Sequence, residues 1–102
     1  MTLRHIVLMR FPDGPDKAFV ARMHAALDVM AKAIPEVLAS HHGSDVSTNP
    51  ENWHYAIIHD FADKAAYERY RVHPAHKQFI VDFMRGRTID KTRVQLSIPG
   101  NG

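Results

Sequence analysis

The segment WHYAIIHDF, residues 53 to 61, has the clearest strand pattern in the sequence. It is rich in aromatic and β-branched residues, and the turn-forming segment TNPEN precedes it, so we expect a β-strand here. Successive side chains of a strand point to opposite faces. The apolar residues therefore fall into two sets, with Tyr55, Ile57 and Phe61 on one face and Ala56 and Ile58 on the other. A strand with two apolar faces is predicted to be covered on both sides.

The segment LRHIVLMRF, residues 3 to 11, repeats this pattern before the turn PDGP. Its two predicted faces carry Leu3, Val7, Met9 and Phe11 on one side and Ile6 and Leu8 on the other. One layer of helices can cover only one face of a sheet. We therefore expect a homodimer in which the sheet of a second identical subunit packs on the other face. The alternative is that these aliphatic side chains are scattered on the surface.

Helices and further strands are predicted around these two segments. A helix should run from Pro15 to Ile34, because apolar residues recur at intervals of three and four and Pro35 then stops it. A weaker strand follows over 37–47, with a bulge or bend at Gly43. The remaining predicted elements are a helix from an Asp63 cap to Tyr70, a helix from Pro74 to Gly86, and a strand over 92–98.

This order of elements predicts an α+β fold of the ferredoxin-like, split βαβ class with a four-stranded antiparallel sheet. The chain of 102 residues has the size of one domain, and no low-complexity linker divides it, so residues 1–102 are predicted to form a single domain.

Composition excludes several classes of function. The sequence has no cysteine, which excludes disulfides and thiolate chemistry. It has no signal-peptide pattern and no apolar stretch approaching the roughly 20 residues of a membrane span, so we expect a cytoplasmic protein without membrane contact. A net charge of +2 is too small for the broad basic face that nucleic acid requires, so no nucleic-acid partner is expected. No dinucleotide, P-loop or nucleophile-elbow motif is present.

The segment YRVHPAHKQF, residues 70 to 79, carries the candidate chemistry. Helical spacing places Tyr70 and His76 on the inward side of their helices, where their polar groups need hydrogen-bond partners or a wet pocket. His73 precedes Pro74 and is suited to capping the next helix. His5 interrupts an apolar strand face and is a candidate partner, so we expect His5, Tyr70 and His76 to converge, with Tyr55 beside them.

Taken together, RHIVLMRF, WHYAIIHDF and YERYRVHPAHKQF resemble the stress-responsive A/B barrel (Dabb) family over essentially the whole chain. The resemblance implies a ferredoxin-like subunit that pairs through its sheet as a dimeric α+β barrel. It also implies a site, because one plant member is a polyketide cyclase that performs an intramolecular aldol condensation. Its catalytic tyrosine and histidine fall on Tyr70 and His76, and its first-strand histidine falls on His5. By the Phe61 register its strand-three histidine falls on Tyr55, where this sequence departs from the pattern.

The resulting hypothesis is a cofactor-free cyclase or small-ligand binder with a hydrophobic or aromatic ligand. His76 would be the general base and Tyr70 would stabilise an enolate, while His5, Tyr55 and His73 would bind substrate. The first alternative is a non-catalytic, stress-associated structural dimer in which these residues only satisfy one another. The second alternative, by analogy of fold, is a cofactor-independent monooxygenase-like enzyme.

No metal site is predicted, although the sequence contains 8 histidines. His73 and His76 are three residues apart and have no carboxylate nearby. His41 and His42 are adjacent in a predicted strand and face opposite ways, so they cannot chelate one ion together and are expected at a solvated edge. Four inward methionines, Met9, Met23, Met30 and Met84, suit either an adaptable pocket or ordinary core packing.

Overall fold

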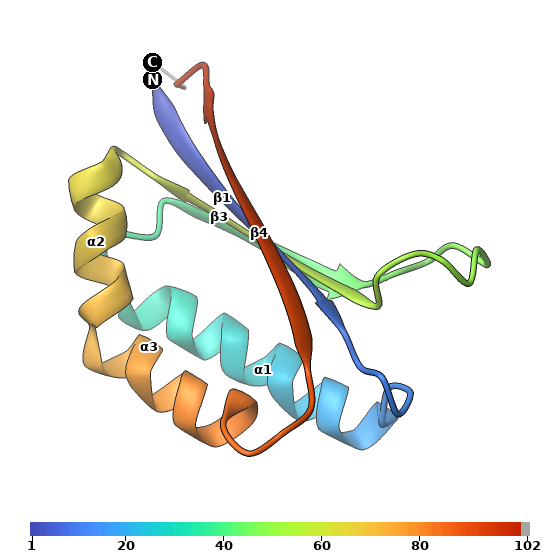
Figure 1. Ribbon diagram of the computed structural model, residues 1–102. Coiled ribbons are helices and arrows are strands. Elements are labelled where there is room, and N and C mark those ends of the chain that lie inside the picture. The colour runs from blue at the N-terminus through green and yellow to red at the C-terminus, as the bar shows by residue number, and fades with distance from the viewer. Residues whose placement is uncertain (101–102) are drawn as a thin grey trace.

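An antiparallel sheet of four strands forms the frame of the computed structural model, which describes residues 1–100 (Figure 1). The elements in chain order are β1 (Thr2–Arg10), α1 (Lys17–Ala33), β2 (Ala39–Ser44), β3 (Tyr55–Phe61), α2 (Lys64–Val72), α3 (Pro74–Phe79), the π-helical turn η1 (Ile80–Met84) and β4 (Asp90–Ile98). The strand order is β2-β3-β1-β4, and every neighbouring pair is antiparallel. The predicted ferredoxin-like α+β class is confirmed.

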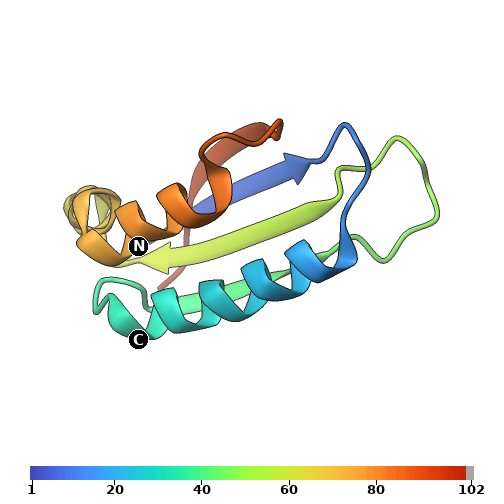
Figure 2. The same ribbon diagram turned by 90° about the horizontal axis from the view of Figure 1, so that it is seen from below.

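The helices cover one face of the sheet, and α1 and α3 lie along it (Figure 2). The predicted alternation is confirmed, because Met9, Tyr55, Ile57 and Phe61 are buried beneath the helices. The helices contribute the other half of this core with Phe19, Met23, Leu27, Met30, Ile34, Ala66, Tyr70, Phe79 and Met84. All four methionines predicted to point inward are buried.

Capping residues set the helix boundaries. The expectation that α1 starts at Pro15 is wrong, because the Asp16 carboxylate accepts hydrogen bonds from the backbone N–H groups of Ala18 (2.9 Å) and Phe19 (3.4 Å) and is itself the N-cap. Pro35 ends the helix as predicted, but the last helical residue is Ala33, because Ile34 before the proline is extended. Asp63 caps α2 as predicted, through a bond of 2.8 Å from Ala66 N–H.

Other bounds also differ from expectation. Strand β1 begins and ends one residue earlier than predicted, β3 begins at Tyr55 and not at Trp53, and α2 continues past Tyr70 to Val72. Strand β2 is shorter than the predicted 37–47 and has no bulge at Gly43, which pairs directly with Ala56. Strand β4 begins two residues earlier than predicted, because Asp90 continues the ladder opposite Arg10. The helix predicted after Pro74 contains the turn η1, whose wider pitch was not predicted. Gly86 ends it with φ of 77°, a conformation that favours glycine.

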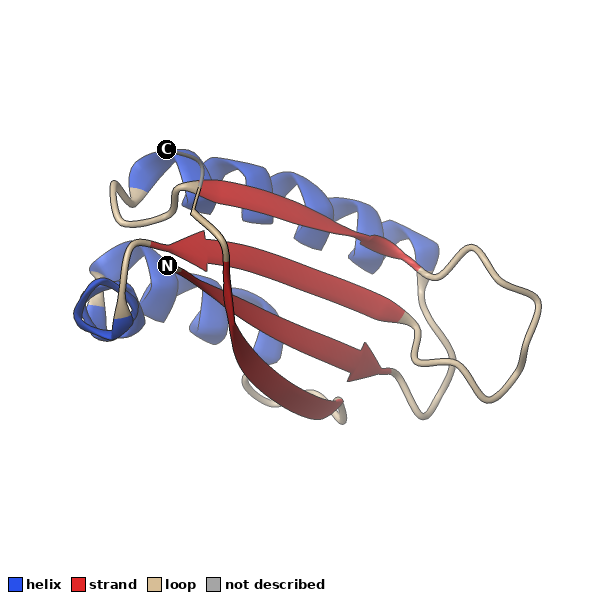
Figure 3. Cartoon of the chain, turned by 90° about the horizontal axis from the view of Figure 1, so that it is seen from above, coloured by secondary structure: helices blue, strands red, loops and turns tan. Residues whose placement is uncertain are grey.

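The other face of the sheet carries no helix among the described residues, and Figure 3 shows its strands uncovered. Ile6 lies between Ile58 and Val94 in the register, and Leu8 lies beside Ala56. Val94 is 56% exposed. Exposed apolar surfaces are typical of interaction sites. At its edge, Arg4 donates to both carboxylate oxygens of Asp60, at 2.8 and 3.0 Å.

No helix within residues 1–100 combines the length and the apolar character that crossing a lipid bilayer would require.

Candidate functional site

A cavity of about 430 Å³ lies between the inner face of the sheet and the helices. Its apolar wall consists of Val7, Met9, Leu27, Met30, Ile57, Phe79, Ile80 and Met84. Its polar wall consists of His5, His59, Tyr67, Tyr70, Arg71, His76, Lys91 and Arg93. Half of the lining residues are thus polar, and convergent polar groups beside an apolar wall are typical of a small-molecule site.

One ring nitrogen of His76 is hydrogen-bonded to the backbone. Its Nδ1 lies 3.0 Å from the carbonyl oxygen of Arg71, and a carbonyl can only accept, so Nδ1 carries the ring hydrogen. In the neutral ring, Nε2 is therefore the nitrogen with a lone pair. Burial lowers the pKa of His76, and the positive charges of Arg71, Lys91 and Arg93 lower it further. The hydrogen bond to the Arg71 carbonyl raises the pKa but does not offset these effects. His76 is thus an uncharged base at neutral pH.

Tyr70 lies beside His76 on the same wall. Their ring centroids are 4.5 Å apart, which brings the last turn of α2 against the first turn of α3. Burial raises the pKa of Tyr70, and the neighbouring Tyr67 adds to this shift. The phenol therefore keeps its hydrogen and acts as a hydrogen-bond donor.

His5 lies on β1 and faces the same cavity, as predicted. The amide nitrogen of Gln95 lies 2.9 Å from His5 Nδ1, so in this orientation Nδ1 accepts and Nε2 carries the hydrogen. Tyr67 packs on the ring at a centroid distance of 4.8 Å. Burial lowers the pKa of His5 to about 4, and the charges of Arg93 and His76 contribute. The expected convergence of His5, Tyr70 and His76 on one cavity is thus present in the structure.

His59 completes the polar wall and was not predicted from the sequence. It lies on β3 directly opposite His5 and is 1% exposed, with both ring nitrogens lacking hydrogen-bond partners within residues 1–100. Burial lowers its pKa to about 4. A signal was present, because His59 continues the inward row of Tyr55, Ile57 and Phe61. A buried polar group without a partner costs about 1–3 kcal/mol, so His59 favours a ligand or water that bonds to it.

Three cations lie on the cavity wall, whereas no carboxylate does. Arg71 is paired with Glu68 at 3.2 Å. Lys91 and Arg93 are neighbours on the inner face of β4, and among the described ion pairs neither has a partner. Burial and the charge of Arg93 lower the pKa of Lys91. This side of the cavity is therefore suited to an anionic group.

His73 lies outside this wall and caps α3. Its Nδ1 accepts a hydrogen bond of 3.0 Å from the backbone N–H of Ala75, and Pro74 occupies the first helical position. The capping prediction is confirmed. His73 therefore acts on the site only through the placement of α3, which carries His76, and a direct contact of His73 with substrate remains a prediction.

Tyr55 is not brought into the cavity with His5 and His76. It is buried at the other end of β3, where its hydroxyl lies 2.7 Å from His42 Nδ1 and 2.9 Å from His24 Nδ1. Burial raises the pKa of Tyr55 to about 12, and the charge of Asp28 adds to the shift. The structure thus separates Tyr55 from the other predicted site residues, and the strand-three histidine opposite His5 is His59.

His42 also lies elsewhere than predicted. The expectation of a solvated edge is wrong for this residue, because its side chain is only 3% exposed and its Nε2 lies 2.7 Å from Asp28 Oδ1. The inner face of β2 packs against α1, which covers His42 and leaves the adjacent His41 exposed.

Comparison with known proteins identifies the family of this chain. The family described as "Stress responsive A/B Barrel Domain" matches residues 3–94. A curated relative from Arabidopsis thaliana, the stress-response A/B barrel domain-containing protein HS1, is 30% identical over 96 residues, which cover 90% of this chain and 84% of the relative.

Solved structures have the same architecture. A dimeric ferredoxin-like protein of unknown function from Thermobifida fusca is 26% identical, with a TM-score of 0.84 over 96% of this chain and 92% of that one. A hydroxynitrile lyase from Passiflora edulis has a TM-score of 0.76 over 98% of this chain and 97% of that one. It is 16% identical, so this likeness concerns the fold alone.

Proposed function

The chain belongs to the stress-responsive A/B barrel domain family, and we propose that it is a cofactor-independent general-base enzyme. The candidate site is the cavity between the sheet and the helices. The substrate is a small, partly apolar carbonyl compound that binds in the cavity of His5, His59, Tyr70 and His76. The enzyme removes a proton from the carbon beside the carbonyl group. The observation that supports this proposal is that His76, with its Nδ1 bonded to the backbone, lines the cavity beside the ring of Tyr70.

The first step is proton transfer from carbon to His76 Nε2. Nδ1 is anchored to the Arg71 carbonyl oxygen, so the ring is fixed in the tautomer that a base requires. The carbonyl hydrogen bond also stabilises the imidazolium that forms when Nε2 takes the proton. The lowered pKa of the free ring keeps it neutral before the reaction.

The negative charge that leaves the carbon moves to the carbonyl oxygen as an enolate. Tyr70, whose ring lies beside that of His76, supplies a hydroxyl donor, and its raised pKa keeps it protonated. His5 Nε2–H supplies a second donor from the sheet. Donors positioned on a developing oxyanion in a buried site contribute most when water is excluded.

In a cyclase, the enolate carbon then attacks a second carbonyl carbon of the same molecule. One carbon–carbon bond forms, and the new alkoxide takes the proton from His76 Nε2, which regenerates the base. The reaction is redox-neutral and needs no oxidant. The apolar wall of Met9, Met30 and Met84 suits a folded chain of variable shape. Lys91 and Arg93 favour a substrate with a carboxylate or a comparable anion.

The apolar outer face of the sheet supports a homodimer as the working form. Ile6, Leu8, Ile58 and Val94 form a continuous surface across three strands. The relative from Thermobifida fusca is described as dimeric. A second copy of this chain, packed sheet against sheet, would remove this surface from water.

Hydrogen–deuterium exchange tests the proton-transfer step by itself, whichever reaction follows it. Small β-diketones and keto acids are incubated with the protein in D₂O, and ¹H NMR follows loss of the signal from the carbon beside the carbonyl. Exchange faster than in buffer, and reduced by His76→Ala, supports the proposal. If neither exchange nor binding is found while the protein is dimeric, the structural-dimer hypothesis replaces it.

A further inference from the structure

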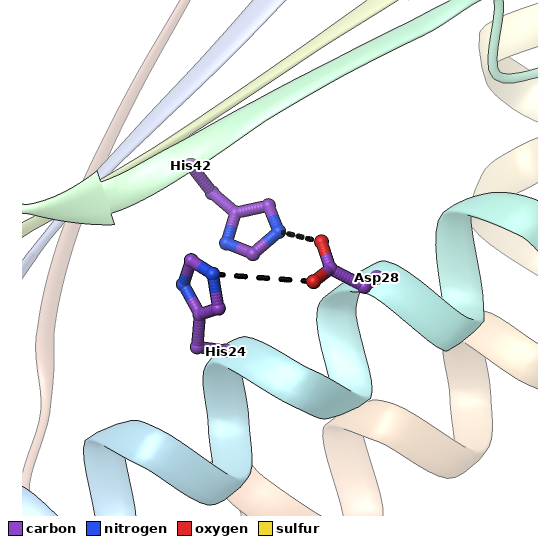
Figure 4. Close-up of side chains that lie close together, drawn as sticks. All are labelled: His24, Asp28 and His42. Carbon is purple, nitrogen blue, oxygen red and sulfur yellow. Dashed lines mark hydrogen bonds and ion pairs between the residues drawn. The ribbon is translucent and has the colours of Figure 1, made fainter.

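A second group of titratable side chains lies away from the cavity, between α1 and β2 (Figure 4). His24 and Asp28 are four residues apart on α1, a spacing that places both on one side of the helix. His42 reaches them from the inner face of β2. The three residues offer one ligand atom each, and these atoms all lie within 4.8 Å of one another.

We propose that His24, Asp28 and His42 bind a divalent transition-metal ion such as Zn²⁺. Two imidazoles and one carboxylate form a ligand set typical of such ions, with the remaining coordination position taken by water. Zinc–nitrogen and zinc–oxygen bonds of about 2 Å require ligand atoms about 3.3 Å apart in a tetrahedral site. The ligand atoms of the protein therefore need only a small convergence.

The mobility of the ligands fits this requirement. The His42 side chain is buried and fixed, whereas His24 and Asp28 are about half-exposed. The Asp28 carboxylate already lies between the two rings, with Oδ1 at 2.7 Å from His42 Nε2 and Oδ2 at 3.9 Å from His24 Nε2. A rotation of the two exposed side chains brings all three groups onto one ion, and the exposed side gives the ion a route of entry.

Tyr55 supplies the outer partner that metal-binding histidines require. Its hydroxyl oxygen lies 2.9 Å from Nδ1 of His24 and 2.7 Å from Nδ1 of His42, so both Nδ1 atoms face the tyrosine and both Nε2 atoms face Asp28. A ligating histidine normally donates its other N–H to such an oxygen, which fixes the ring and its tautomer. When His42 Nε2 binds the ion, its ring hydrogen is carried on Nδ1, where Tyr55 accepts it.

Without an ion, the same four residues form a chain of hydrogen bonds. Asp28 accepts from His42, and the Tyr55 hydroxyl connects His42 to His24. This arrangement differs from the cavity site, where His5, His59 and His76 have no carboxylate among the lining residues. The metal proposal is thus independent of the proposed enzymatic function.

Isothermal titration of the metal-free protein with Zn²⁺ tests the site. One ion per chain is expected, and the variants His24→Ala and Asp28→Asn should each weaken binding at least tenfold. The matched control is His41→Ala, which removes the neighbouring histidine of the same strand from the opposite face. Both ligand variants change half-exposed side chains, so circular dichroism should show an unchanged fold.

The variant Tyr55→Phe tests whether the tyrosine supports a built metal site or whether the histidines bind metal ions nonspecifically. This variant keeps all three ligands and should retain one ion per chain with about 10–100-fold weaker affinity. Co²⁺ bound to the unmodified protein should give visible absorption bands of a four-coordinate site, and His24→Ala should abolish them. Zn²⁺ affinity that is unchanged in His24→Ala and Asp28→Asn, or equally reduced in His41→Ala, would overturn the proposal.

Discussion

His5 on β1 and His59 on β3 are direct cross-strand neighbours, and both face the cavity between sheet and helices. Burial lowers the pKa of each ring to about 4. Both rings are therefore neutral at physiological pH. Because burial disfavours the protonated rings, it also makes the stability of the fold depend on pH.

Stability is predicted to fall in acid because of these histidines. The His59 pKa is lowered from 6.5 to about 4, with burial as the main cause, and the charges of His42, His5 and His76 outweigh that of Asp60. The unfolded chain thus binds more protons between these values. Stability should be full above about pH 6.5 and decline towards pH 4, where His59 alone accounts for about 3 kcal/mol. Urea unfolding at fixed protein concentration measures this.

The variant His59→Leu tests whether His59 is responsible for the loss of stability in acid. It removes two buried nitrogens without partners, so it should be at least as stable as the unmodified protein at pH 7 and lose about 2–3 kcal/mol less between pH 6.5 and pH 4. An identical acid slope in both proteins would assign the pH dependence to other groups.

Catalysis is predicted to depend on His76 and Tyr70. His76→Ala removes the base and should lower the exchange rate by about 10²–10⁴-fold, and Tyr70→Phe removes an oxyanion donor and should lower kcat by about 10²–10³-fold. Lys77→Ala, an exposed change on the same helix, is the control. Unfolding in urea should show small losses of stability in both site variants. Full activity of His76→Ala would exclude it as the base.

The positive charges of Lys91 and Arg93 on β4 are predicted to favour the binding of anionic substrates. Lys91→Gln and Arg93→Gln each remove one cation from the cavity wall. Each should raise KM for a keto acid while leaving KM for an uncharged β-diketone within about twofold, because the lost attraction acts only on the anion. Steady-state kinetics at low and high salt measure the difference. Equal effects on both compounds would indicate that these residues shape the cavity and do not select charge.

Assembly through the outer face is predicted to depend on Val94. Val94→Asp places a charge in the proposed dimer face, beside Ile6, and should yield a monomer in sedimentation velocity. Val29→Asp, which changes an exposed valine on α1, should leave the dimer intact. A monomeric unmodified protein, or a dimer that persists in Val94→Asp, would contradict assembly through this face.

The boundaries and faces of the elements follow from local rules. Pro35 ends α1 because it restricts Ile34, Asp63 caps α2 through Ala66, and the period of two along β1 and β3 assigns each side chain to a face. These patterns act over a few residues and are visible in the sequence. The convergence of His5, Tyr70 and His76 was also predictable, because each is the polar member of an inward apolar row.

Only the tertiary structure decided the partners of His59, His42 and Tyr55. Residue 59 meets His5 because of the register between β3 and β1, and His42 meets Asp28 because α1 packs on β2. Tyr55 lies on the same face of β3 as His59 but at the other end of the strand, where it contacts His24 instead of the cavity. Contacts between distant segments depend on register and packing angle, which the short-range periodicity of a sequence does not specify.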